Sequence, residues 1–86
     1  MNIIDEIKDA FKKYNPDLYV IAIFIAEKDL YFVVAKHTPD KTTVEEDPFY
    51  MYGNGKVTGV TITDSEERMN NAFEIMQAKN RIYEID

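Results

Sequence analysis

The order of hydrophobic and polar positions indicates one helix followed by two strands in the first half of the chain. Apolar residues recur at helical spacing from Ile3 to Tyr14, with Asn2 placed to cap the start of the helix and Asn15-Pro16 to end it. Leu18 to Ala26 and Leu30 to Lys36 are rich in β-branched and aromatic residues, which favour strands. The short polar link between these two segments predicts an antiparallel hairpin.

The second half of the chain repeats strand-like patterns and then returns to helical spacing. After a polar loop over residues 37–47, Pro48 to Tyr52 predicts a short aromatic strand, Gly53-Asn54-Gly55 a tight turn, and Val57 to Ile62 a strand that alternates. Thr63-Asp64-Ser65-Glu66-Glu67 offers a helix start, and the apolar stripe that follows consists of Met69, Ala72, Phe73 and Met76. The tail Arg81 to Ile85 is either a frayed helix end or a short added strand.

These segments predict a single α+β domain over residues 1–86, in the order α-β-β-β-β-α. Its sheet would be four-stranded and antiparallel, with an N-terminal and a C-terminal helix. The simplest arrangement places both helices on one face of the sheet.

The first strand is apolar on both faces, which a sheet covered on only one side does not require. Strict alternation places one set of its residues on one face and the other set on the opposite face; the sets are Leu18, Val20, Ala22, Phe24 and Ala26, and Tyr19, Ile21, Ile23 and Ile25. The second strand behaves in the same way. Three interpretations stay open: the helices or the 81–85 tail cover both faces, the chain self-associates as a homodimer, or a different protein docks there.

Composition excludes several classes of site. The chain contains no cysteine, which excludes disulfides, zinc–thiolate sites and thiol catalysis and suits a reducing cytoplasm. The longest apolar run has nine residues, far fewer than the ~20 that a membrane helix needs. A net charge of −6 disfavours direct binding to nucleic acid or to an anionic membrane, and it suits a partner protein with a basic surface.

The negative charge is concentrated in one stretch. Residues 40–67 contain seven acids and two lysines, and therefore five of the six net negative charges. The run Glu45-Glu46-Asp47 is either a solvated loop or a lure for lysine and arginine on a partner. Tyrosines combine contact area with a polar end, which favours them at interfaces. We therefore expect the partner-binding residues to be Tyr19, Tyr31, Glu45, Glu46, Asp47, Tyr50 and Tyr52.

No motif in the chain indicates catalysis or a cofactor. The only histidine, His37, precedes several carboxylates, so a metal site or an acid–base pair is conceivable, but neither has a recognisable spacing. Gly53-Asn54-Gly55-Lys56 lacks the spacing of a phosphate-binding loop and is better explained as a hairpin turn. We expect a protein that is not an enzyme and that holds neither a metal nor a cofactor.

The segment from Glu46 to Tyr83 resembles a hairpin of small bacterial immunity-type proteins, which neutralise toxins by binding them. The resemblance is carried by Asp47-Pro48-Phe49-Tyr50, a turn, and Gly55-Lys56-Val57 before a strand and a helix. The chain lacks the proline that many members have after the second strand. The resemblance implies a non-enzymatic inhibitor and identifies no toxin-contacting residue.

The leading hypothesis from the sequence is a small acidic, cytoplasmic protein-binding domain, either an immunity-type inhibitor or another accessory of a mobile element. One alternative is a phage-encoded nucleic-acid mimic or inhibitor of a host defence nuclease, which would use the same acidity. A second alternative is a homodimeric structural domain. A small enzyme or ligand-binding domain would require a polar pocket around His37.

Overall fold

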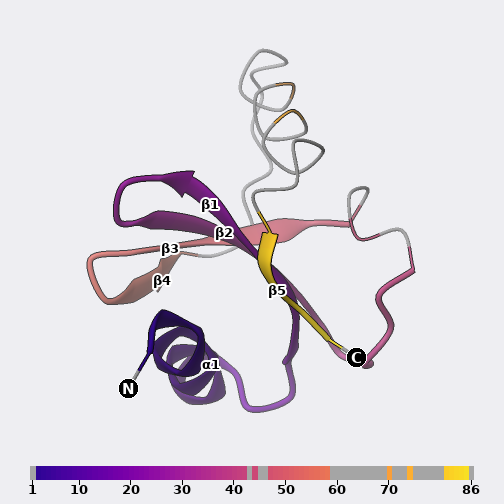
Figure 1. Ribbon diagram of the computed structural model, residues 1–86. Coiled ribbons are helices and arrows are strands. Elements are labelled where there is room, and N and C mark those ends of the chain that lie inside the picture. The colour runs from indigo at the N-terminus through magenta and orange to yellow at the C-terminus, as the bar shows by residue number, and fades with distance from the viewer. Residues whose placement is uncertain are drawn as a thin grey trace.

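The computed structural model describes residues 2–42, 44, 47–58, 70, 74 and 81–85. Within them, one helix lies against a five-stranded antiparallel sheet, so the predicted α+β class is confirmed and the predicted count of four strands is wrong (Figure 1). The elements are α1 (Ile3–Tyr14), β1 (Tyr19–Glu27), β2 (Leu30–Lys36), β3 (Phe49–Gly53), β4 (Lys56–Thr58) and β5 (Arg81–Glu84). The strand order is β4-β3-β2-β1-β5.

Helix α1 has the boundaries that the sequence predicts. The Asn2 side chain accepts a hydrogen bond from the Asp5 backbone N–H at 2.9 Å, which satisfies one of the free donors of the first turn. Asn15 takes an extended conformation ahead of Pro16 and ends the helix. Ile7 and Phe11 are fully buried, and they fix the face that the helix turns toward the sheet.

Two tight turns set the hairpins. Lys28 and Asp29 connect β1 to β2, and Asp29 adopts the left-handed conformation with a φ of 61°. Asn54 and Gly55 connect β3 to β4 with φ values of 53° and 74°. Because two successive residues with positive φ match the twist of the flanking strands, the predicted Asn-Gly turn is confirmed at this point.

The fifth strand comes from the C-terminal tail, for which the sequence allowed either a frayed helix end or an added strand. Arg81–Glu84 pairs antiparallel with β1, with Ile23 opposite Tyr83 and Ala22 opposite Glu84. β1 is therefore paired on both sides. The predicted helix after Thr63 and the part of the predicted strand beyond Thr58 fall outside the described residues, apart from Asn70 and Glu74.

The predicted assignment of β1 side chains to the two faces holds as far as Ile21 and is reversed from Ala22 to Phe24, because β1 contains a bulge. Val20 pairs with Ala35, but Ala22 pairs with Val34, so Ile21 is an extra residue on β1. An extra residue shifts the alternation by one position. As a result Leu18, Val20 and Ile23 face α1, whereas Ile21, Ala22 and Phe24 belong to the opposite face.

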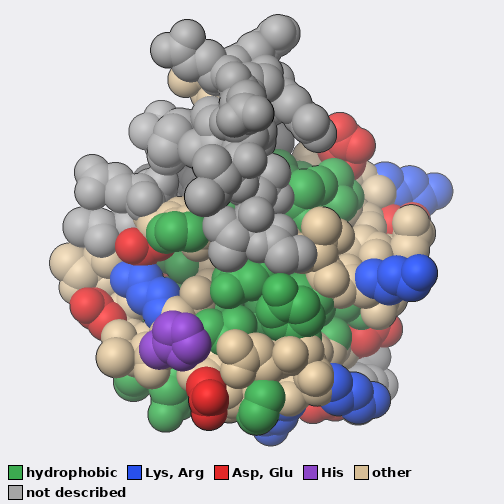
Figure 2. All heavy atoms as spheres, turned by 180° about the vertical axis from the view of Figure 1, so that it is seen from behind, with side chains coloured by type: hydrophobic (Ala, Val, Ile, Leu, Met, Phe, Trp, Pro, Cys, Tyr) green, Lys and Arg blue, Asp and Glu red, His purple; other side chains and the backbone are tan. Residues whose placement is uncertain are grey.

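Both faces of the sheet carry buried cores, as the apolar pattern requires. The core under α1 joins Ile7 and Phe11 to sheet residues that include Val33 and Tyr52. On the other face, the core around Ile21, Phe24 and Val34 is packed against by partly buried residues such as Met51 and Ile85. Seen from behind, hydrophobic side chains gather at the centre of the molecule (Figure 2).

Candidate functional site

An aromatic cluster joins the end of α1 to β3. The Tyr50 ring lies edge-on to Phe11, with centroids 5.3 Å apart, and edge-on to Tyr14 at 5.8 Å. Phe11 is buried, whereas the Tyr14 side chain is 47% exposed. Edge-to-face contacts of this kind hold aromatic rings in place. The exposed Tyr14 ring is therefore held in position by contacts with the Phe11 and Tyr50 rings.

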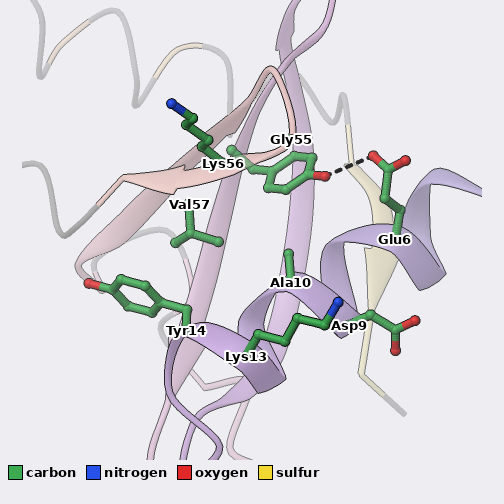
Figure 3. Close-up of a pocket in the computed structure, with 9 residues that line it drawn as sticks. Glu6, Asp9, Ala10, Lys13, Tyr14, Gly55, Lys56 and Val57 are labelled. Carbon is green, nitrogen blue, oxygen red and sulfur yellow. Dashed lines mark hydrogen bonds between the residues drawn. The ribbon is translucent and has the colours of Figure 1, made fainter.

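Next to this cluster, an open groove of about 710 Å³ separates α1 from the β3–β4 hairpin (Figure 3). One wall is the flank of α1 and the other is the hairpin, with Ala10 and Val57 as small apolar surfaces between them. The residues that line the groove are Glu6, Asp9, Ala10, Lys13, Tyr14, Tyr52, Gly55, Lys56 and Val57.

A hydrogen bond between Tyr52 and Glu6 crosses one end of the groove. The Tyr52 hydroxyl donates to the Glu6 carboxylate oxygen Oε2 at 2.8 Å (Figure 3). Burial of Tyr52, followed by this bond and by the Glu6 charge, raises the pKa of the Tyr52 hydroxyl to about 12. The phenol is therefore protonated at neutral pH, and it ties β3 to the first turns of α1.

Charges of both signs line the groove. Glu6 and Asp9 come from α1 and are joined by Lys13 from the same helix and Lys56 from the hairpin turn. No ion pair joins any two of these four side chains within the part of the chain that the structure describes. The Asp9 carboxylate is thus available to a cationic group, whereas Glu6 already accepts the Tyr52 hydroxyl. The Tyr14 ring, at the other end of the groove beyond Lys13, offers a cation a second attractive surface (Figure 3).

Among the described residues, the structure brings three of the predicted tyrosines together in the core under α1 and leaves Tyr19 and Asp47 apart from them. Tyr50 belongs to the aromatic cluster, and Tyr52 is 3% exposed and part of the core under α1. Tyr31 is half-buried beside Tyr52, with ring centroids 6.5 Å apart. Tyr19 is 50% exposed at the start of β1, next to the flank of α1 that carries Lys8 and Lys12.

Of the predicted acidic run Glu45-Glu46-Asp47, the structure describes only Asp47. Asp47 is paired with Lys36, and Glu45 and Glu46 lie outside the described residues. The ammonium group of Lys36 also donates to the backbone oxygen of Thr42 at 3.3 Å. The Asp47 carboxylate is therefore committed to a contact with the end of β2.

Glu6, Asp9 and Tyr14 are groove residues that the sequence reasoning missed. They are polar or half-exposed positions of a helix, where solvated side chains are the ordinary expectation. Spacings of three or four residues join Glu6 to Asp9 and, through Ala10, join Glu6 to Tyr14, and this is the signal that could have found them. What the sequence cannot show is that this flank faces the β3–β4 hairpin.

His37 lies in an exposed polar loop at the end of β2. No cluster of three histidine, aspartate or glutamate side chains suited to a metal occurs among the described residues. Nearby, Asp40 accepts hydrogen bonds from the Thr42 hydroxyl at 2.6 Å and from its backbone N–H at 2.9 Å. These bonds lower the pKa of the Asp40 carboxyl and order a local turn.

Comparison with known protein families, with curated proteins and with solved structures finds no match to this chain. In the described portion, no helix is long and apolar enough to cross a membrane.

Proposed function

We propose that this chain is a small, acidic, non-enzymatic protein-binding domain that holds a basic side chain of its partner in the groove between α1 and the β3–β4 hairpin. The observation that carries this proposal is the position of the Tyr14 ring. It is half-exposed, supported by Phe11 and Tyr50, and placed on the same groove as Glu6 and Asp9.

The physical reason is that an aromatic ring face and a carboxylate both attract a cation. A lysine or arginine laid along the groove would meet the Asp9 carboxylate or the Tyr14 ring with its charged end. Ala10 and Val57, between these two groups, would receive the apolar part of its side chain (Figure 3). A ring that is already ordered loses little conformational entropy when it binds. The overall charge of −6 would attract such a partner over distance.

An immunity-type inhibitor is one form of this proposal. The resemblance carried by Asp47-Pro48-Phe49-Tyr50 supports a toxin as the partner, and the absence of cysteine suits a partner met in the cytoplasm. In this form the toxin would present the basic side chain, and neutralisation would follow from occlusion rather than from chemistry.

Selection of peptides from a random phage-displayed library would test the proposal. We expect enriched peptides to contain arginine or lysine beside an apolar residue, and to bind about tenfold or more weakly to the Tyr14→Ala variant. Asp9→Asn should also weaken them, and rising salt should weaken the wild-type complex.

Matched controls make this test specific. Tyr19→Ala removes a ring of similar exposure, 50% against 47%, from the start of β1, away from the groove. Asp17→Asn removes a carboxylate that does not line the groove. The proposal is refuted if the selected peptides lack a basic residue, or if Tyr14→Ala and Tyr19→Ala weaken them equally.

A further inference from the structure

The outer edge of β5 has no strand paired with it within the described part of the chain. β5 ends the strand order, and its only described partner is β1. The Ile85 backbone N–H donates inward to the Ile21 carbonyl at 2.8 Å. Because successive residues of a strand direct their backbone groups to opposite sides, the N–H and C=O of Glu84 point toward the open edge. An edge of this kind is a template for an added strand.

A second, smaller groove lies beside this edge, on the flank of α1 that faces away from the β3–β4 hairpin. Its volume is about 190 Å³, and it is bounded by α1, the start of β1 and the end of the chain. The lining residues are Lys8, Lys12, Leu18, Tyr19, Val20, Tyr83 and Ile85. The β5 edge and this groove share Tyr83.

The charge of the second groove is opposite to that of the whole chain. The Lys8 ammonium nitrogen lies 3.9 Å from the centre of the Tyr83 ring, and Lys12 follows one turn later on the same flank. Neither lysine forms an ion pair with any residue that the structure describes. Two positive charges are therefore collected at an apolar groove, and no described carboxylate neutralises them.

We propose that β5 and this groove together bind an extended, acidic segment of a partner protein. The segment would add a strand to the β5 edge and bond to the backbone of Glu84. The Cβ atoms of directly paired residues on neighbouring strands lie about 5 Å apart. A side chain of the added strand directly opposite Tyr83 would therefore lie close to the Lys8 ammonium group, which sits over the Tyr83 ring. If that side chain carried a carboxylate, Lys8 and Lys12 would bind it.

The unpaired edge of β5 indicates that the bound segment is extended, and the two lysines indicate that it is acidic. The free backbone groups of β5 recognise a strand of any sequence, whereas the lysine pair selects a carboxylate within it. This site lies on the opposite flank of α1 from the groove of the proposed function. It would stand even if the proposed function failed, because it uses different residues and the opposite charge.

The test uses a capped pentapeptide, Thr-Val-Asp-Val-Thr, and the matched peptide with asparagine in place of aspartate, titrated into the ¹⁵N-labelled full chain. With the aspartate peptide we expect the Glu84 amide to shift and to exchange more slowly. The Ile85 amide, already bonded to Ile21, should move less. The asparagine peptide should bind about three- to tenfold more weakly. Lys8→Gln and Lys12→Gln should remove that preference, whereas Lys28→Gln, in the β1–β2 turn, should leave it intact.

Four outcomes would overturn the proposal. Unchanged Glu84 exchange would refute strand addition, and equal binding of the two peptides would refute the lysine pair as a carboxylate site. Acetate that produces the same Lys8 and Tyr83 shifts with an unchanged Glu84 amide would assign the groove to free carboxylic acids. Concentration-dependent protection of Glu84 without any peptide would assign the edge to a second copy of the chain.

Discussion

Replacing Tyr52 by phenylalanine isolates one hydrogen bond that ties the sheet to α1. The ring is 3% exposed and would stay buried in the variant, so the change removes only the hydroxyl that donates to Glu6 at 2.8 Å. Bonds to charged groups contribute about 1.5–3 kcal/mol, and the exposure of Glu6 to solvent brings this one to that lower limit or somewhat below it. We expect Tyr52→Phe to lower the free energy of unfolding at pH 7 by about 1–1.5 kcal/mol, measured by urea denaturation.

The difference in unfolding free energy between wild type and Tyr52→Phe should also depend on pH, which provides a sharper test. The pKa of Tyr52 is raised from 10.0 to about 12 in the folded chain. A raised pKa means that the stabilisation is fully present below pH 10 and is lost as the pH rises toward 12. Each pKa unit corresponds to 1.36 kcal/mol, so about 2–3 kcal/mol would be lost across this window. The advantage of tyrosine over phenylalanine should therefore vanish near about pH 11.

The control is Tyr14→Phe, because the Tyr14 hydroxyl forms no hydrogen bond within the described residues and its ring is half-exposed. This variant should differ from wild type by less than about 0.5 kcal/mol at pH 7. If the stability difference between wild type and Tyr52→Phe is constant from pH 7 to pH 12, the assignment of the shifted pKa to Tyr52 is refuted.

Three further predictions concern the fold. Phe24 is fully buried in the core opposite α1, so Phe24→Ala should lower the free energy of unfolding by about 3–5 kcal/mol in urea denaturation, and a loss below about 1 kcal/mol would contradict that burial. Asn2→Ala removes the cap of α1 and should cost about 0.5–2 kcal/mol, measured by thermal melting followed at 222 nm, with Asn2→Asp as the variant that keeps stability. Gly55 has a φ of 74° and open space around its missing Cβ, so Gly55→Ala should cost about 1–2 kcal/mol in denaturant through backbone strain alone; an unchanged midpoint would argue against the left-handed turn.

Local signals in the sequence were sufficient to predict much of the fold. The cap at Asn2, the stop at Asn15-Pro16 and the Asn54-Gly55 turn each depend on neighbouring residues only, and each is confirmed. The same holds for the boundaries of Leu30–Lys36, which a short link and a polar loop delimit. Such features are readable because their physical cause lies within a few residues of them.

The features that the sequence analysis missed depend on residues far apart in the chain. The bulge at Ile21 is a property of the pairing between β1 and β2, and no residue type in β1 predicts it. Arg81–Glu84 becomes a strand because β1 offers it an edge. In the same way Glu6 becomes a site residue only because β3 carries Tyr52 to it.

Helix α1 contributes residues to both proposed sites, and its orientation determines which substitutions affect one site without the other. Ile7 and Phe11 point into the core and set the rotation of the helix about its axis. That rotation turns Glu6 and Asp9 toward the β3–β4 hairpin, and Lys8 and Lys12 toward β1 and the end of the chain. A flank substitution should therefore change binding at one groove only, since the flanks share no partner. A substitution of Ile7 or Phe11 should disturb both grooves together, because both depend on the same seating of the helix.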